Sequence, residues 1–267
     1  MRKILFAVAF AIFANTQAFA IFGIGAHYIM NTGSLNSNRG LAYAEEPLIS
    51  IDLEQQKADG LQGIGFKAWI DIIPVVDIEG TLNVAATRYK TSLNILTPVG
   101  DTTIKLSYTP DAPYSMIFGE ADPLFGVVNG DISVTYPFDL PVIRPYIGAG
   151  FSYFASIPIA NASFASKMLN NPKNKDLLDA LLPGDPADPN ANIDPGAASK
   201  VGKALINTLQ KESYTTGMGG HIIAGIRIKP PVIPLAVYAN GKYYFGGNTN
   251  SQFSQGLVLE AGGGFAL

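Results

Sequence analysis

The chain has 267 residues, of which 48% are hydrophobic and only 15% charged, with 28 glycines, 18 prolines and no cysteine. A charged fraction below the quarter or so that is usual for soluble domains argues against a disordered chain and an ordinary cytosolic enzyme, and the lack of cysteine excludes disulfide scaffolds and thiolate chemistry. The net charge of −3 gives no indication of a nucleic-acid partner.

The first twenty residues have the pattern of a secretory signal peptide. Arg2 and Lys3 form a short positive region, residues 4–14 are an uninterrupted apolar run, and Ala18-Phe19-Ala20 has the small-x-small pattern that signal peptidase accepts. The run is too short for a lone membrane anchor, and no later window reaches the roughly eighteen consecutive apolar residues of a membrane helix. We therefore predict a signal peptide over 1–20 and a mature domain over 21–267.

Segments of alternating apolar residues run through the mature domain. They form three hairpins with proline-bearing turns at 73–76, 137–142 and 229–234, and proline suits such turns because its φ is fixed and it donates no ladder hydrogen bond. With one segment at each end of the domain, the pattern predicts eight strands, over 22–30, 65–72, 77–89, 127–136, 143–155, 217–228, 235–246 and 256–267.

The connections between the hairpins are long and polar, over 31–44 and onward to Gly60, and over 90–125, 156–216 and 247–255. Short turns at one end and long loops at the other are typical of an outer-membrane barrel. We therefore predict an all-β fold, a closed antiparallel up-and-down transmembrane β-barrel of about eight strands. Residues 91–96 and 103–108 also alternate, so they either extend a hairpin above the membrane or raise the strand count to ten.

The two faces of the predicted strands differ in polarity. One set of alternate residues is apolar, and Arg88, at the loop end of its strand, is the one charged residue that shares its parity. The opposite set contains four cations and four anions: Lys67, Arg144, Arg227, Lys242, Asp71, Glu79, Asp131 and Glu260. Because an eight-stranded barrel is just filled by its side chains, we expect these charges to form a salt-bridged plug and not an open pore.

A soluble sandwich or a lipocalin-like barrel is the competing interpretation, because its strands alternate as well. In that case the apolar face lies inside and the charges lie outside. This alternative does not explain why so few charged residues occur in the strands.

The chain resembles small outer-membrane β-barrel proteins of the OmpA/OmpW-like, roughly eight-stranded type. The resemblance rests on the leader over 1–20, the glycine-rich first strand over 22–28, the hairpin around Pro74 and the closing strand over 257–267. It covers nearly the whole mature domain as an architecture. The last residue in that family is usually aromatic, whereas here it is Leu267, with Phe265 on the same face two residues earlier.

No pattern predicts a catalytic, cofactor or metal site. A hydrolase site needs a nucleophile near a histidine, and the two histidines, His27 and His221, both have inward parity and come with no Gly-x-Ser-x-Gly elbow. A lipid-modifying enzyme that pairs one of them with Ser133 or Ser152 is kept as an alternative. Residues 185–194 alternate oxygen ligands as a calcium loop does, but they lack its glycine and its bidentate glutamate, so a proline-rich turn is favoured.

The long connection over 156–216 contains two predicted helices. Asn174 is a candidate N-cap for a helix over 175–182, and Asp194 with Pro195 begins another that runs to about Lys211. The second carries an apolar stripe of Val201, Leu205 and Leu209. We favour packing of this stripe on the barrel rim over its use as an extracellular docking surface.

Together these features predict a monomer in the outer membrane of a Gram-negative-type bacterium, exported by its signal peptide and surrounded by outer-membrane lipid. Its expected role is structural or interactive and not catalytic, and the loop over 156–216 is the expected contact for an extracellular ligand or protein. A second hypothesis is the binding or passage of small hydrophobic molecules, with a cavity lined by Trp69, Tyr146, Phe154 and Tyr238.

Overall fold

The computed structural model describes residues 22–45, 49–73, 75–97, 100–107, 121–138, 140, 142–176, 195–211, 214–230, 233–247 and 249–266. The predicted signal peptide and the candidate calcium loop over 185–194 lie outside the described residues.

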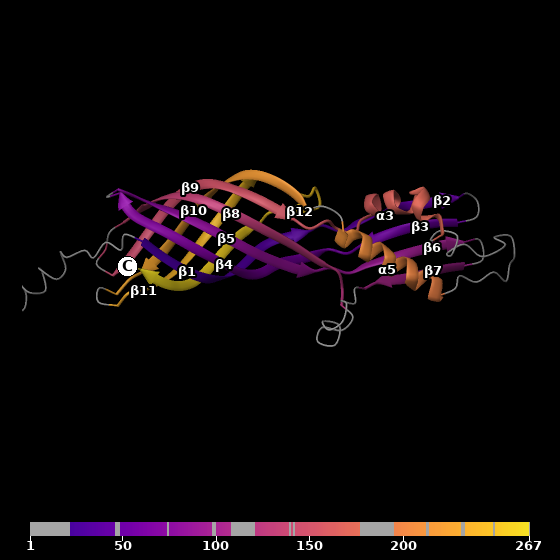
Figure 1. Cartoon of the computed structure of the whole chain (residues 1–267), viewed down its shortest axis with the longest axis horizontal. Helices are drawn as coiled ribbons and strands as arrows, with labels where there is room; N and C mark the ends of the chain where they lie inside the picture. Colours follow the sequence, from indigo (N-terminus) through magenta and orange to yellow (C-terminus); the bar gives the residue numbers. More distant parts are fainter. Residues whose placement is uncertain are drawn as a thin grey trace, which may run out of the picture.

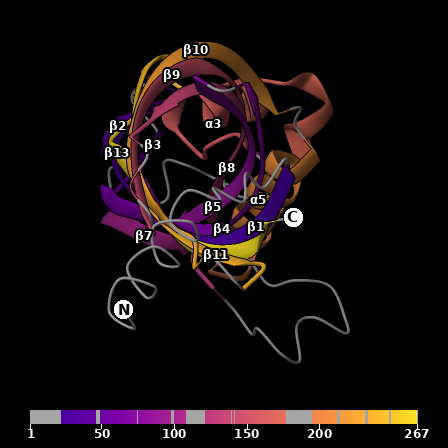
Figure 2. The same ribbon diagram turned by 90° about the vertical axis from the view of Figure 1, so that its left-hand side faces the viewer.

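Eight long antiparallel strands close into a barrel (Figures 1 and 2). Each strand pairs with the next long strand along the chain, and β1 pairs with both β13 and β4, which closes the ladder. The prediction of a closed up-and-down barrel of eight strands is therefore confirmed. The strands are β1 (Phe22–Leu35), β4 (Ala58–Ile73), β5 (Val76–Arg88), β8 (Leu124–Pro137), β9 (Ile143–Ser156), β10 (Thr215–Ile228), β11 (Leu235–Gly246) and β13 (Leu257–Ala266).

Glycines allow the last strand to approach the first. A Cβ atom at Gly264 would lie 2.1 Å from the Ile24 carbonyl oxygen, and one at Gly262 would lie 2.2 Å from the Ala26 carbonyl oxygen. No real side chain tolerates such contacts, so glycine is required where β13 pairs with β1.

A second, smaller sheet lies beyond the end of the barrel that is opposite the short turns (Figure 1). Its four strands have the order β2-β3-β6-β7, and together with the helices beside them we call this part the outer layer. The elements of the outer layer are β2 (Asn38–Glu45), β3 (Ile49–Gln55), β6 (Thr91–Thr97), β7 (Gly100–Leu106), α3 (Ala162–Leu169), η1 (Pro172–Asn174) and α5 (Pro195–Lys211). A two-residue strand, β12 (Phe253–Ser254), pairs with the end of β1.

The outer layer decides between the two strand counts that the sequence allowed. Strand β6 pairs with β7 and with β3, and neither β6 nor β7 pairs with the barrel, so they extend a hairpin above it. The expectation that 31–44 and the residues up to Gly60 are a polar connection is wrong, because β1 continues to Leu35 and the hairpin β2–β3 follows. A register shift between Leu41 and Tyr43 interrupts the alternation in β2, which hid this strand from the pattern.

The helices of the outer layer were predicted in part. Helix α5 has the predicted bounds, whereas the described residues of the predicted helix over 175–182 reach only Asp176. Helix α3 was missed; its N-cap is Asn161, whose side-chain oxygen accepts a hydrogen bond from the Phe164 N–H at 2.8 Å. Among the described residues, no helix is both long and apolar enough to cross a membrane.

An apolar core fills the outer layer and continues into the mouth of the barrel. Leu53 of β3, Leu93 of β6 and Leu205 of α5 are fully buried in it, as is Phe125 at the mouth. The apolar stripe of α5 therefore packs against β7 of the outer sheet and not on the barrel rim as expected. Tyr89 lies in the same core and accepts a hydrogen bond from the Ala160 N–H at 2.9 Å, and burial raises the pKa of its hydroxyl to about 12.

Candidate functional site in the barrel interior

The two faces of the barrel strands have the polarity that the sequence predicted. Apolar side chains cover the outside, with Ile132 67% and Phe151 81% exposed. Along the described barrel strands, every charged side chain points inward and is buried or half-buried, except those of Arg88 and Asp59, which lie at the ends of β5 and β4 next to the outer layer and are exposed. Barrel closure then places these inward side chains in contact across the interior.

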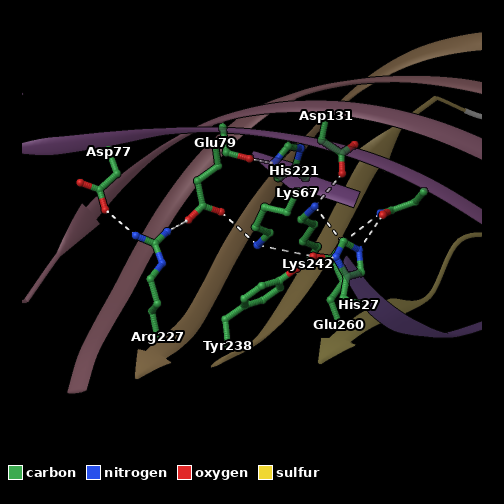
Figure 3. Close-up of polar contacts among 12 residues, drawn as sticks. His27, Lys67, Asp77, Glu79, Asp131, His221, Arg227, Tyr238, Lys242 and Glu260 are labelled. Carbon is green, nitrogen blue, oxygen red and sulfur yellow. Dashed lines mark hydrogen bonds and ion pairs between the residues drawn. The ribbon is translucent and has the colours of Figure 1, made fainter. Parts of the chain in front are cut away.

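Arg227 is the centre of an ion-pair cluster near the short turns. Its guanidinium lies 3.3 Å from Asp71 Oδ1. It also lies 3.3 Å from Asp77 Oδ2 and donates a hydrogen bond to Glu79 (Figure 3). Arg144 approaches Asp71 at 3.1 Å from the neighbouring strand. Because its guanidinium holds several N–H donors in a fixed planar arrangement, one arginine can bind several carboxylates at once.

Two lysines continue the network toward the outer layer. Lys67 Nζ lies 3.1 Å from Glu79 Oε2 and 3.6 Å from Glu260 Oε2. Lys242 Nζ lies 2.8 Å from Glu260 Oε1 and 2.7 Å from Asp131 Oδ2, and the side chains of these three residues are fully buried. Glu79 and Glu260 therefore connect the two ends of the network, each by contacting two cations.

The two histidines occupy separate parts of this interior. His27 Nε2 lies 2.8 Å from Asn83 Oδ1, and its Nδ1 lies 3.0 Å from the Tyr238 hydroxyl. His221 lies between two serines, with Nε2 2.8 Å from Ser133 Oγ and Nδ1 2.7 Å from Ser152 Oγ.

The serine pair around His221 differs from a hydrolytic triad in two respects. Each ring nitrogen of His221 contacts a serine, so no carboxylate orients the ring as in a Ser-His-Asp arrangement. Ser133, Ser152 and His221 are also buried, with at most 3% of their surface exposed. The arrangement satisfies the polar groups of a packed interior.

The four aromatic residues proposed to line a cavity pack against charged or aromatic neighbours. Trp69 lies 4.8 Å from the Arg227 guanidinium, Tyr238 lies 4.9 Å from Lys67 Nζ, and Tyr146 is within 6 Å of both cations. Phe154 packs edge-on against Tyr244 with ring centroids 5.2 Å apart. All four are nearly inaccessible to solvent.

Two apolar depressions lie instead on the outer wall of the barrel. One of about 510 Å³ is bordered by Tyr28, Ile226 and Leu259, and one of about 400 Å³ by Ile147, Ile222 and Leu257. Small residues on adjacent strands, among them Ala224 and Gly241, form their floor. None of the four aromatic residues lines either depression.

Sequence reasoning missed two members of the interior network. Asp77 pairs with Arg227, which brings the carboxylates to five against four cations among the described interior residues. The Tyr244 hydroxyl donates to Asp131 Oδ2 at 2.9 Å. Asp77 lies two residues before the inward Glu79, and Tyr244 lies two residues after the inward Lys242. Because alternate residues of a strand share a face, this spacing could have identified both as inward residues. Among the described residues, no three histidine or acidic side chains are grouped to hold a metal ion.

Barrel closure, an apolar exterior and a charged, buried interior together define a transmembrane β-barrel of eight strands. The charged residues of the interior form ion pairs with one another, and the apolar core of the outer layer lies above them.

The sequence matches no protein-family model and no curated protein. Among solved structures, the chain is similar to Ail, the attachment invasion locus protein of Yersinia pestis, with 9% identity, 91% of this chain and 96% of that chain covered, and a TM-score of 0.37. It is also similar to Neisserial surface protein A, with 13% identity, coverage of 92% and 97%, and a TM-score of 0.39. For the outer membrane protease OmpT of Escherichia coli the identity is 11%, the coverage 95% and 100%, and the TM-score 0.29.

Proposed function

We propose that this chain is a monomeric, non-catalytic barrel of the outer membrane of a Gram-negative-type bacterium, sealed along its axis, that presents the outer layer to the exterior. The observation that carries the proposal is the fully buried trio of Lys242, Asp131 and Glu260 inside a wall whose outer face is apolar. Charges inside and apolar side chains outside are stable only if hydrocarbon surrounds the wall.

The outer layer is the part that is suited to recognition. Its sheet and helices share one apolar core with the barrel mouth, so they form a rigid platform and not a set of separate loops. Its exposed side chains are mostly polar, among them Lys203 on α5 and Lys167 on α3. The sequence indicates residues 156–216 as the contact for an extracellular ligand or protein. We propose that the hairpins β2–β3 and β6–β7 take part in this contact as well.

Cysteine labelling tests the location and the orientation of the barrel, because the natural chain contains no cysteine. In the Lys203→Cys variant the thiol would lie on the exposed side of α5, and in the Val75→Cys variant in a short turn at the opposite end, where Val75 is 59% exposed. On intact cells a membrane-impermeant maleimide is expected to label the first variant only. Both are expected to react once the outer membrane is permeabilised.

Two companion measurements complete the test. A folded barrel in the outer-membrane fraction is expected to migrate faster in gel electrophoresis before boiling than after it. Recovery of the protein in the soluble periplasmic fraction, or labelling of the Val75→Cys variant on intact cells, would contradict the proposal. In planar bilayers we expect no conductance above that of the empty membrane.

The two alternatives from the sequence are tested separately. Apolar molecules that co-purify with the protein, or cross vesicle membranes containing it, would favour binding or passage of hydrophobic molecules. A changed lipid profile in cells that carry wild-type protein but not the His221→Ala variant would favour a lipid-modifying enzyme.

A further inference from the structure

Strand β7 is an edge of the outer sheet. Among the described residues its one partner strand is β6, so backbone N–H and C=O groups of alternate residues point away from the sheet along its other side. Asp101, Thr103 and Lys105 are exposed, whereas Ile104 is half-buried and Leu106 is buried beneath α5.

The two charges on this edge have no ion-pair partner among the described residues. In the ladder Asp101 lies opposite Leu96 and Lys105 lies opposite Ser92, neither of which carries a charge. The two charged residues are four positions apart, about 13 Å along an extended strand, which is too far for them to pair with each other. An aspartate and a lysine are thus placed symmetrically about Thr103 on one face of an edge with which no other described strand pairs.

We propose that β7 is a homotypic interaction surface, which pairs antiparallel with β7 of a second copy of this chain. A two-fold pairing centred on Thr103 places Asp101 opposite the partner's Lys105 and Lys105 opposite the partner's Asp101. Shifting the centre by one residue in either direction moves both charges opposite threonine or out of β7. Cross-strand ion pairs therefore select the register centred on Thr103, and the two four-stranded sheets become one sheet of eight strands.

The direction of the strands determines how the two copies are oriented. Neighbouring antiparallel strands are related by a two-fold axis perpendicular to their sheet. The strands of the outer sheet run along the long axis of the barrel (Figure 1), so this two-fold lies in the plane of the membrane and the second barrel points the opposite way. The two copies consequently belong to facing membranes. This step rests on the membrane location proposed above, and it is compatible with a monomer within each membrane.

Reversing the charges of Asp101 and Lys105 tests the pairing, because one reversal is expected to break it and the complementary reversal to restore it. In the Asp101→Lys variant both charged positions of the edge are basic, and in the Lys105→Asp variant both are acidic, so each variant repels itself. A mixture of the two variants restores both cross-strand ion pairs, as does the double variant Asp101→Lys/Lys105→Asp.

The measurement is clustering of proteoliposomes of phosphatidylcholine that carry the refolded protein, followed by light scattering. Wild type, the double variant and the mixture of the single variants are expected to cluster. Each single variant alone is expected to need about tenfold more protein per vesicle, because two favourable pairs become repulsive. Matched controls are Asp59→Lys and Lys167→Asp, which reverse exposed charges away from β7 and are expected to cluster as wild type does.

The outcomes separate this inference from the proposed function. Failure of the wild type to insert into vesicles, judged by heat-modifiable migration, contradicts the membrane barrel and the facing-membrane pairing with it. Insertion without clustering contradicts the edge pairing alone. If the single variants cluster as the wild type does, or if their mixture does not cluster, a surface other than the β7 edge holds the vesicles together. Either result also contradicts the pairing.

Discussion

The barrel and the outer layer have interiors of opposite polarity, and barrel strand β4 extends from the charged interior into the apolar core that the barrel mouth shares with the outer layer. In the barrel its inward Lys67 is buried and its outward Phe66 is 61% exposed, whereas near the outer layer its inward Leu61 is buried and its outward Gln62 is exposed. The parity is unchanged from Leu61 to Lys67. Only the medium outside has changed, from hydrocarbon to water, so the surroundings decide which side chains form the interior.

The cores of the two regions are consequently stabilised in different ways. The barrel interior depends on compensated charges, in which each buried ion needs its partner. The outer layer depends on apolar burial and on the volume that its side chains fill. Substitutions in the two regions are therefore expected to destabilise the protein by different mechanisms.

The largest effect is expected from removing one interior cation. Lys242→Met leaves Asp131 and Glu260 buried without this partner, which is expected to lower the free energy of unfolding by about 3–5 kcal/mol. Urea unfolding in detergent, followed by the fluorescence of Trp69, the single tryptophan, measures it. The control is Lys167→Met on the exposed face of α3, and a loss below about 1 kcal/mol in Lys242→Met would contradict the charge-based core.

A cavity in the outer layer is expected to have a somewhat smaller and local effect. Leu53→Ala removes a fully buried side chain and is expected to cost about 3 kcal/mol. Limited trypsin digestion should cleave the outer layer of this variant faster while heat-modifiable migration of the barrel is kept. Leu41→Ala, at a leucine that is 56% exposed, is the matched control and should leave the digestion rate unchanged. Loss of the folded barrel in Leu53→Ala would mean that the two regions unfold together.

A charge on the outer wall distinguishes hydrocarbon from water outside the barrel. Ile132→Lys, at a residue that is 67% exposed on β8, is expected to cost about 2 kcal/mol in a lipid bilayer. The same change at Leu41 of the outer layer should alter the stability by no more than about 0.5 kcal/mol. Unfolding in lipid vesicles measures both changes in stability. Equal effects at the two sites would contradict the conclusion that hydrocarbon surrounds the barrel and water surrounds the outer layer.

The smallest effect is expected at the start of α3. Asn161→Ala removes the acceptor for the Phe164 N–H and is expected to lower stability by about 1 kcal/mol. Hydrogen exchange of the α3 amides reports this change directly. Asn161→Asp keeps an acceptor oxygen and serves as the control; the cap would be unimportant if both variants exchanged alike and faster than the wild type.

Strong local patterns were sufficient to predict the barrel strands and α5. A clear N-cap and N1 pair and an apolar stripe marked α5, and long stretches of the eight barrel strands alternate regularly. The register shifts of β1 and β4 lie near the ends of these strands, between Asn31 and Ser34 and between Ile70 and Ile73. Strand β2 was missed because a register shift near Tyr43 breaks its alternation. Helix α3 was missed because it has only eight residues, which is too short a segment for a helical period to be recognised.

Which side chains lie on each face of a strand follows from the order of the residues alone, because side-chain direction alternates with every residue and needs no distant contact. Which of these side chains meet depends on how the strands are arranged in the folded barrel. Arg227 contacts Asp71 and Glu79, which are 156 and 148 residues away, and both contacts depend on the register of several strands around a closed ladder. Pairing of this kind is non-local, so parity predicts the charges of the interior but not their partners.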